Sequence, residues 1–191
     1  MEYGVDVVGT SGDEALMLRV RSGDTGLLAE LFERHHRGVY GFFYRMTSSR
    51  EMSEDLVQDV FLRILRYRET YQPKTSFSAW MYGIARNALI DQMRKRRPEA
   101  AIDDSLPEFS CGDALADEQF RARQETAMVR KALASLPADK REVLILSRYQ
   151  DLKYDEIGRI LGCEANTVKQ RVFRAVRALG DRFAELAGEA R

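Results

Sequence analysis

Apolar residues recur at intervals of three and four along most of the chain, and this spacing predicts an all-α protein. No segment of strand length alternates regularly between apolar and polar residues. All four prolines lie between the apolar-periodic segments, where a residue without an amide donor does least harm. The pattern predicts helices near residues 13–21, 25–46, 51–67, 77–97, 117–134, 138–149, 153–161 and 164–183.

The segment 151–179 has the layout of two short helices joined at Gly162, which permits a tight turn. The apolar stripe of the first helix contains Tyr154, Ile157, Ile160 and Leu161, and that of the second contains Val168, Val172, Ala175, Val176 and Leu179. At about 100° per residue, a polar face lies opposite the second stripe. This face comprises Thr167, Gln170, Arg171 and Arg174, flanked by Lys169 and Arg177. Such a layout is typical of a helix-turn-helix that reads DNA.

The charges of the chain are segregated, although its 30 basic and 30 acidic residues cancel. Residues 93–97 read MRKRR, residues 98–118 contain seven acids and no base, and residues 165–179 contain four bases and no acid. The basic face of 165–179 is either the solvated side of a packing helix or a DNA-binding surface. The glycine turn directly before it favours DNA binding.

The stretch 98–116 is rich in proline, glycine, serine and acids, so it can bury little apolar surface against its ordering entropy. We therefore expect two small helical domains joined by a flexible acidic linker, the C-terminal domain being the helix-turn-helix. The expected boundaries are an N-terminal segment 1–23, a first domain 24–97, a linker 98–124 and a second domain 125–185. The two domains need not touch in the free protein.

Several functional classes are disfavoured. No apolar run is long enough to cross a membrane, and the N-terminus lacks the order of charges of a secretion signal, so we expect a cytoplasmic protein that does not insert into a membrane. Cys111 and Cys163 have no paired spacing, which argues against a disulfide framework or a zinc site. His35 and His36 lack an HExxH-like partner. We expect no catalytic residue, metal, cofactor or small-molecule substrate, and hence no enzyme.

The helix 51–67 has a core face and an opposite polar face that contains an apolar residue. The core face carries Val57, Val60, Phe61, Ile64 and Leu65, and the polar face carries Asp55, Gln58, Asp59 and Arg66. Leu62 falls among these polar residues. It is either an isolated exposed leucine, which is common, or an anchor for a protein partner with a basic, partly apolar surface.

The helix 77–97 combines aromatic residues with a basic end. Phe77 and Trp80 lie on its apolar face, and the core is the favoured place for both. Its cations are Arg86, Arg94, Lys95, Arg96 and Arg97. The preceding loop carries Tyr71, Lys74, Thr75 and Ser76, residue types that suit stacking on and hydrogen bonding to an unpaired base.

Together these segments resemble bacterial RNA polymerase sigma factors of the extracytoplasmic-function type (ECF, group IV of the sigma-70 family), which contain only the two DNA-contacting domains. The resemblance covers about residues 27–183. It rests on EDLVQDVFLRILR and FSAWMYGIARNALIDQMRKRR in the first domain, and on LPADKREVLILSRYQDLKYDEIGRILGCEANTVKQRVFRAVRAL in the second. The order and spacing of these segments make an accidental match improbable.

The resemblance implies three contact surfaces. The helix 51–67 would dock on a coiled coil of the polymerase largest subunit through Asp55, Gln58, Asp59, Leu62 and Arg66. The loop 71–76 would capture a flipped base of the minus 10 promoter element, with Asn87, Asp91, Arg94, Lys95, Arg96 and Arg97 along the promoter strand, although Asp91 is equally suited to pair structurally with an arginine. The C-terminal helix would enter the major groove of the minus 35 element.

The resemblance also implies partners: core RNA polymerase, including its flap, promoter DNA, and an anti-sigma factor that masks the polymerase and DNA surfaces. Two positions depart from the family pattern. Val176 replaces a common arginine, and Asn166 replaces a frequent small residue. The promoter sequence therefore does not transfer from relatives, and Gln170 is of a type that reads adenine bidentately.

Two alternatives remain open from the residues. The chain is either a polymerase specificity subunit or a stand-alone helix-turn-helix regulator, whose N-terminal domain would show a ligand pocket or a dimer helix. The linker is either a soluble tether or a polyanion that occupies a basic channel of the polymerase until nascent RNA displaces it. The acids concerned are Asp103, Asp104, Glu108 and Asp113.

Overall fold

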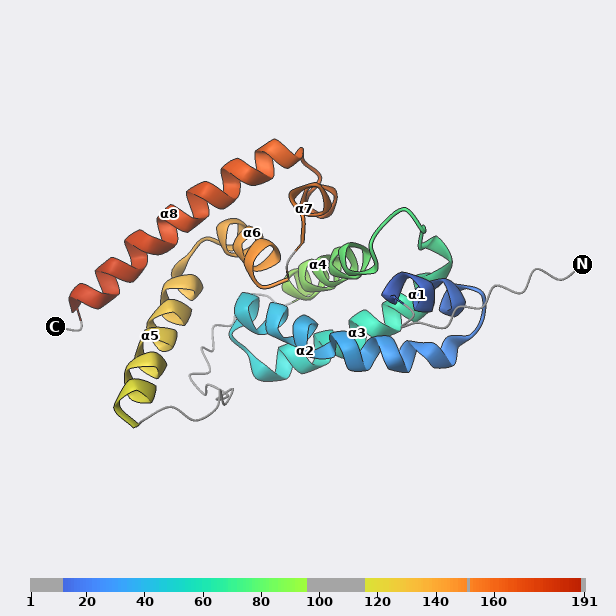
Figure 1. Cartoon of the computed structure of the whole chain (residues 1–191), viewed down its shortest axis with the longest axis horizontal. Helices are drawn as coiled ribbons and strands as arrows, with labels where there is room; N and C mark the ends of the chain where they lie inside the picture. The colour runs from blue at the N-terminus through green and yellow to red at the C-terminus, as the bar shows by residue number, and fades with distance from the viewer. Residues whose placement is uncertain (1–11, 96–115, 151, 190–191) are drawn as a thin grey trace, which may run out of the picture.

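The computed structural model describes residues 12–95, 116–150 and 152–189, and this part of the chain contains helices and no strand. The first group comprises α1 (Asp13–Arg21), α2 (Leu28–Thr47), α3 (Arg50–Tyr67) and α4 (Phe77–Lys95), with short 3₁₀ helices at Thr25–Leu27 and Arg68–Thr70. The second comprises α5 (Ala116–Ser135), α6 (Ala138–Arg148), α7 (Tyr154–Leu161) and α8 (Ala165–Glu189). Figure 1 shows α8 crossing above α5 and α6, with α7 next to α4.

The predicted helices are confirmed, with differences at their ends. The helix predicted from residue 25 begins with a 3₁₀ turn, and the one predicted to end at 183 continues to Glu189. Residues 116–124, which we assigned to the linker, belong to α5. The acids of the linker at positions 103, 104, 108 and 113, like Cys111, Arg96 and Arg97, lie outside the described residues.

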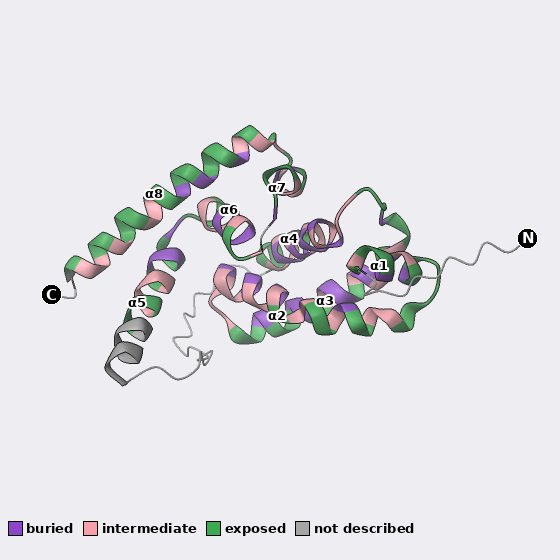
Figure 2. Cartoon of the chain, in the orientation of Figure 1, coloured by how far each residue is buried: buried purple, intermediate pink, exposed green. Residues whose placement is uncertain are grey.

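The first group packs around α2 and α3, which reverse direction at Ser48 and Ser49. Ser48 ends α2 in the left-handed conformation at φ 54°, and the Ser49 hydroxyl caps α3 by accepting the Met52 amide at 3.3 Å. The buried side chains of this core include Phe42, Phe43, Val60, Ile64, Phe77 and Met81. Helix α1 adds Leu16, Met17 and Val20 to the same core (Figure 2). Phe77 is therefore a core residue as predicted, while Trp80 is partly buried against it.

The second group packs α6 and α7 under α8. Its core is made by Val143, Leu144, Ile145 and Leu146 of α6, Ile157 of α7, and Val168, Val172 and Ala175 of α8. The buried apolar residues of both groups form one continuous cluster, because α7 packs on α4 and α6 on α2. The sequence left open whether the domains touch, and in this structure they do.

Candidate nucleic-acid interface

The turn between α7 and α8 depends on two glycines. Gly162 ends α7 in the left-handed region at φ 66°, where a side chain is strained. Gly158 is buried within α7, and a Cβ placed on it would lie 2.5 Å from the backbone oxygen of Cys163. The Cys163 amide also donates to the Gly158 carbonyl at 2.9 Å. Helix α7 and the turn that follows it therefore approach so closely that only glycine fits at position 158.

Replacing Gly158 with alanine should lower the free energy of unfolding by about 1–3 kcal/mol, because the new methyl group must displace backbone in a packed turn. Urea unfolding followed by circular dichroism measures this. The matched control is Gly180→Ala on α8, where no atom lies within 4 Å and alanine should stabilise the helix by about 0.5–1 kcal/mol. Equal effects of the two substitutions would show that the close approach at Gly158 does not constrain the turn.

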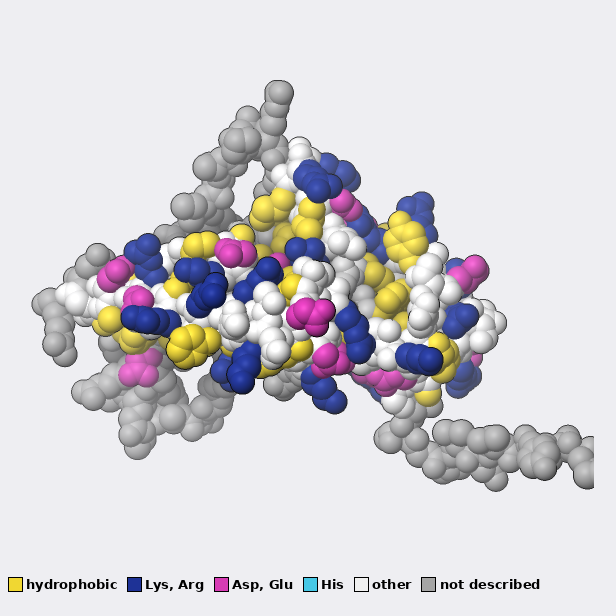
Figure 3. Space-filling model, turned by 90° about the horizontal axis from the view of Figure 1, so that it is seen from above, with side chains coloured by type: hydrophobic (Ala, Val, Ile, Leu, Met, Phe, Trp, Pro, Cys, Tyr) yellow, Lys and Arg dark blue, Asp and Glu magenta, His cyan; other side chains and the backbone are white. Residues whose placement is uncertain are grey.

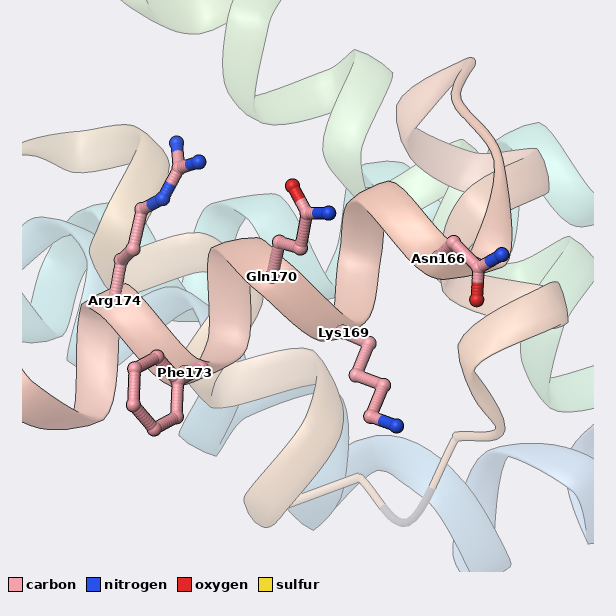
Figure 4. Close-up of a pocket in the computed structure, with 5 residues that line it drawn as sticks. All are labelled: Asn166, Lys169, Gln170, Phe173 and Arg174. Carbon is pink, nitrogen blue, oxygen red and sulfur yellow. The ribbon is translucent and has the colours of Figure 1, made fainter.

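The outer face of α8 presents cations, an amide and an aromatic ring. Lys169, Gln170, Arg171, Arg174 and Arg177 are exposed, and Thr167 is half-buried. Figure 4 shows Gln170 and Arg174 pointing to one edge of this face from successive turns, and Lys169 and Phe173 pointing to its other edge. With Asn166, these four side chains line a shallow hollow. Seen from above, the molecule shows Lys and Arg side chains with apolar and some acidic side chains between them (Figure 3). The surface suits the edge of a duplex.

Phe173 is the residue of this face that the sequence analysis missed. It is 72% exposed, the most exposed large hydrophobic side chain among the described residues. Its position in the sequence could have revealed it. Phe173 lies four residues after Lys169, on the same side of the helix, and outside the buried stripe of Val168, Val172 and Ala175. An apolar ring beside Arg174 offers contact to a thymine methyl group.

The apolar stripes are narrower than we predicted. Val176, placed on the stripe of the second helix, is 44% exposed, and Tyr154, placed on that of the first, is 36% exposed. Both predictions were wrong, because each helix packs on one side only, and its buried arc does not reach the flanks of the apolar pattern. Val176 therefore extends the exposed face of α8.

The polar face of α3 surrounds an exposed leucine. Leu62 is 66% exposed, and Asp55, Gln58 and Arg66 beside it are exposed as well. Asp59 is half-buried, and its carboxylate accepts from the Arg63 Nε at 2.9 Å. An apolar side chain encircled by polar groups on an ordered helix has the form of a protein-docking surface.

Arg63 joins this surface to α4. The Arg63 Nη1 donates to the Asp91 carboxylate at 2.8 Å, so the guanidinium of Arg63 links Asp59 and Asp91. The hydrogen bond from Arg63 lowers the pKa of Asp91, and the charges of Arg63, Arg94 and Lys95 lower it further. Asp91 therefore has the structural arginine partner that we considered, and its carboxylate stays ionised.

The loop before α4 is held in shape by the buried side chain of Tyr71. Tyr71 is fully buried, its ring packs edge-on against Trp80 at 5.2 Å between centroids, and its hydroxyl donates to the Thr75 carbonyl at 2.9 Å. The prediction that Tyr71 stacks on a base is therefore wrong for this conformation, because its ring is a core element that shapes the loop. Burial raises the pKa of Tyr71 to about 12, so the hydroxyl remains a donor.

The other predicted residues of this region differ in their exposure. Lys74, Asn87, Arg94 and Lys95 are exposed, and Thr75 and Ser76 are half-buried. The Ser76 hydroxyl accepts the Ala79 amide at 3.3 Å at the start of α4, and it also donates to the carboxylate of Glu156 on α7. The loop thus touches the helix-turn-helix directly.

The described residues contain no cluster of three or more histidine, cysteine or acidic side chains that suits a metal ion. Cys163 is half-buried and unpaired in the turn before α8. Within the described ranges, no helix combines the length and the apolar character that spanning a bilayer requires.

Comparison with known proteins matches both halves of the chain to parts of one family. Residues 31–99 match sigma-70 region 2, and residues 126–179 match sigma-70 region 4. Two solved structures share the fold: CnrH in complex with the cytosolic domain of CnrY (24% identity, 90% of this chain and 96% of that one, TM-score 0.68), and the sigma factor RpoE in complex with the anti-sigma factor NepR from Bartonella quintana (26%, 82% and 96%, 0.66).

Curated relatives agree over most of the chain. The ECF RNA polymerase sigma factor SigE of Mycolicibacterium smegmatis is 32% identical over 189 residues, which cover 97% of this chain and 70% of the relative. The RNA polymerase sigma factor CarQ of Myxococcus xanthus is 32% identical over 173 residues, covering 89% and 97%. The ECF RNA polymerase sigma-E factor of Escherichia coli K12 is 30% identical over 184 residues, covering 91% and 95%. Because regions 2 and 4 both match, in this order along the chain, and relatives of 30% identity or more cover most of it, the chain belongs to the ECF sigma factors of the sigma-70 family.

Proposed function

We propose that this sigma factor binds core RNA polymerase, reads a two-part promoter with its two domains and holds the opened strand, so that transcription starts at a specific set of genes. The observation that carries the proposal is the pairing of an exposed cationic and aromatic face on α8 with a second helical domain that matches region 2. A stand-alone regulator is not favoured, because its N-terminal domain would have no reason to match region 2.

Helix α8 reads the minus 35 element in this proposal. Arg171 and Arg174 supply the planar donors that suit guanine, and Gln170 supplies the paired donor and acceptor that suit adenine. Phe173 contacts a thymine methyl group beside them. Lys169 and Arg177 contact phosphates, which adds salt-dependent affinity without sequence preference.

The first domain holds the polymerase and the minus 10 element. Leu62, with Asp55, Gln58, Asp59 and Arg66 around it, docks on the largest-subunit coiled coil, and the second domain meets the flap. Lys74, Thr75 and Ser76 remain for the flipped base, since Tyr71 is buried. Asn87, Arg94 and Lys95 lie along the promoter strand, together with Arg96 and Arg97. The domain boundaries proposed for this division are 24–97 and 125–185, preceded by 1–23 and joined by 98–124.

Strand opening then requires binding energy and no chemistry. Unstacking and unpairing a base requires a few kcal/mol, which contacts to the splayed strand offset. The sigma factor therefore acts by holding opened DNA better than closed duplex, as a cytoplasmic protein without catalytic activity, metal or cofactor. An anti-sigma factor is the inhibitory partner, by analogy with RpoE, whose structure contains the anti-sigma factor NepR.

The test is run-off transcription from a genomic fragment library, with core RNA polymerase in the presence and absence of the protein. New, discrete start sites preceded by a shared two-part motif support the proposal and give the promoter sequence. DNA binding by the protein alone, without new start sites, would instead support a stand-alone regulator.

The docking surface is tested by Leu62→Asp. A carboxylate at the centre of the apolar contact should weaken binding to core polymerase by at least about tenfold, since truncating a central apolar anchor typically removes 2 kcal/mol or more. The matched control is Gln124→Asp, which places the same charge at an exposed position of α5. Fluorescence anisotropy of labelled protein titrated with core polymerase measures both. Equal affinities of the two variants would remove Leu62 from the docking surface.

A further inference from the structure

We infer that α1 positions the minus 10 loop, residues 71–76: Glu14 and Arg21 brace the two ends of the loop, and this brace sets how strictly the loop selects the base that it captures. The inference deepens the proposed promoter function and rests on it. Helix α1 ends before the segment that matches sigma-70 region 2, which begins at residue 31. The match to region 2 therefore gives α1 no role.

Two hydrogen bonds join α1 to the ends of the loop. The Arg21 Nη1 donates to the Tyr71 carbonyl at 3.0 Å, where the loop begins. The Glu14 Oε1 accepts the Phe77 amide at 3.1 Å, where the loop passes into α4. An amide in the first turn of a helix lacks an acceptor within that helix, and Glu14 supplies one. Both bonds join a charged side chain to the main chain, so they fix the path of the loop backbone.

The spacing of these two residues along α1 suits the two ends of the loop. Residues seven apart complete about two turns of a helix, so Glu14 and Arg21 lie on one face, about 10 Å apart along the axis. Met17 lies between them on that face and is fully buried. Because each residue of a helix advances by the same distance, the backbone of α1 fixes the separation of the two points that hold the loop.

Helix α1 is itself anchored to the first domain. Its apolar side is buried in the core, and its start is tied to α2 through Asp13. The Asp13 carboxylate accepts the Arg34 Nη1 at 2.8 Å and lies 2.6 Å from the His35 Nε2. The His35 ring in turn lies 5.2 Å from the ring of Phe77, measured between centroids. A helix fixed in this way can hold the loop, because it does not move with it.

Between its two ends, the loop is closed by its own hydrogen bonds. The Thr75 amide donates to the Gln72 carbonyl at 3.0 Å, and the Thr75 carbonyl accepts from the Tyr71 hydroxyl at 2.9 Å. Lys74 is exposed and Thr75 is half-buried. The polar groups proposed to meet the flipped base therefore have a defined arrangement before DNA binds.

A loop that is fixed before binding selects more strictly than one that adjusts. When the wrong base enters a fixed site, polar groups of the site lose their partners, which lowers the affinity for that base. A loop that moves freely re-forms contacts with each base, so the affinities for different bases become similar. Loss of the brace should therefore reduce the discrimination between bases more than the affinity for the preferred base.

The first experiment measures amide hydrogen exchange in the free chain by NMR. Arg21→Ala and Glu14→Ala should each speed exchange of the Thr75 amide by about three- to tenfold, the effect of losing one hydrogen bond. Arg21→Lys and Glu14→Gln keep a donor and an acceptor, so they should restore most of the protection. The control is Arg19→Ala, which removes an exposed ion pair with Asp24 and should change nothing in the loop. Parent exchange rates at Thr75 in both alanine variants would overturn the inference.

The second experiment measures base selection by the polymerase holoenzyme. Its probes are single-stranded oligonucleotides with the minus 10 element of a promoter found by run-off transcription, carrying each of the four bases at the captured position. In Arg21→Ala and Glu14→Ala, the ratio of affinities between the preferred base and the others should fall by about three- to tenfold. Binding to a minus 35 duplex should not change. Arg21→Lys and Glu14→Gln should recover the ratio, and Arg19→Ala should keep it.

A general loss of stability would give a different result from a loss of positioning. Fewer folded molecules would bind all four oligonucleotides and the minus 35 duplex less, by one common factor, and the ratio would stay that of the parent. A direct phosphate contact of Arg21 would also weaken all four oligonucleotides equally. Either result would contradict a positioning role of α1. A parent holoenzyme that does not distinguish the four bases would contradict the proposed function, and the exchange rates in the free chain would still decide whether α1 holds the loop.

Discussion

Replacing Arg174 with alanine should weaken binding of the polymerase holoenzyme to its promoter by about 5- to 150-fold, because a bidentate arginine contact to a base edge contributes about 1–3 kcal/mol of discrimination. Arg174 is exposed at the outer face of α8, one turn after Gln170, and points the same way (Figure 4). Its removal should therefore act on the minus 35 element and leave opening at the minus 10 element unchanged. Fluorescence anisotropy on a promoter found by the transcription experiment, with variants of each element, measures this.

The control for Arg174 is Lys169→Ala on the same hollow. A phosphate contact is blind to sequence, so this variant should weaken binding to promoter and unrelated DNA alike and reduce the salt dependence by about one ion. If Arg174→Ala also weakens both kinds of DNA equally, then Arg174 contacts the backbone and base reading lies with Gln170, Arg171 or Phe173.

Replacing Tyr71 with alanine should lower the free energy of unfolding by about 3–5 kcal/mol, as expected for the loss of a large aromatic side chain from a packed core. The side chain is fully buried against Trp80, and its hydroxyl fixes the loop through Thr75. Tyr71→Phe keeps the ring and loses only that hydrogen bond, so it should lose about 1 kcal/mol. Urea unfolding monitored by tryptophan fluorescence and circular dichroism compares the two.

The same pair of variants separates a core residue from a base-stacking residue. Tyr71→Phe retains an aromatic face, so either role predicts that it opens promoters. Tyr71→Ala at a temperature where it remains folded distinguishes them: a core residue predicts opening reduced only as far as the loop is loosened, and partly recovered by stabilising solutes. If Tyr71→Ala instead unfolds at the same urea concentration as the parent and yet opens no promoter, then Tyr71 leaves the core to meet DNA.

Much of the fold follows from local sequence. Ser49 before α3 and Gly162 after α7 mark helix ends through capping and backbone freedom, which are properties of single residues and their neighbours. The apolar spacing of Val168, Val172 and Ala175 predicts the buried side of α8 because every residue of one helix turns by the same angle. The exposed cations opposite that stripe follow from the same geometry.

What the sequence could not predict depends on contacts between distant segments. The local sequence of a polar loop is the same whether its tyrosine faces solvent or packs on Trp80. Whether Tyr71 is buried depends on the space that the surrounding helices leave for its ring. Phe173 is exposed because α8 packs on one side only, a fact of tertiary structure. The contact between the domains rests on Arg86, Glu142 and Gln150, which lie far apart along the chain and match no local pattern.

Arg63 alters how genetic data on the first domain must be interpreted. It donates to Asp59 on the proposed polymerase surface and to Asp91 on the proposed DNA surface, at 2.9 and 2.8 Å. Residues that share a partner are not energetically independent. A substitution of Asp59 frees the guanidinium to bind Asp91 alone, so a promoter defect in such a variant is no proof that Asp59 touches DNA. The two surfaces of this domain are separate in space, but they are coupled electrostatically through Arg63. Single substitutions therefore cannot by themselves assign a residue to one surface or the other.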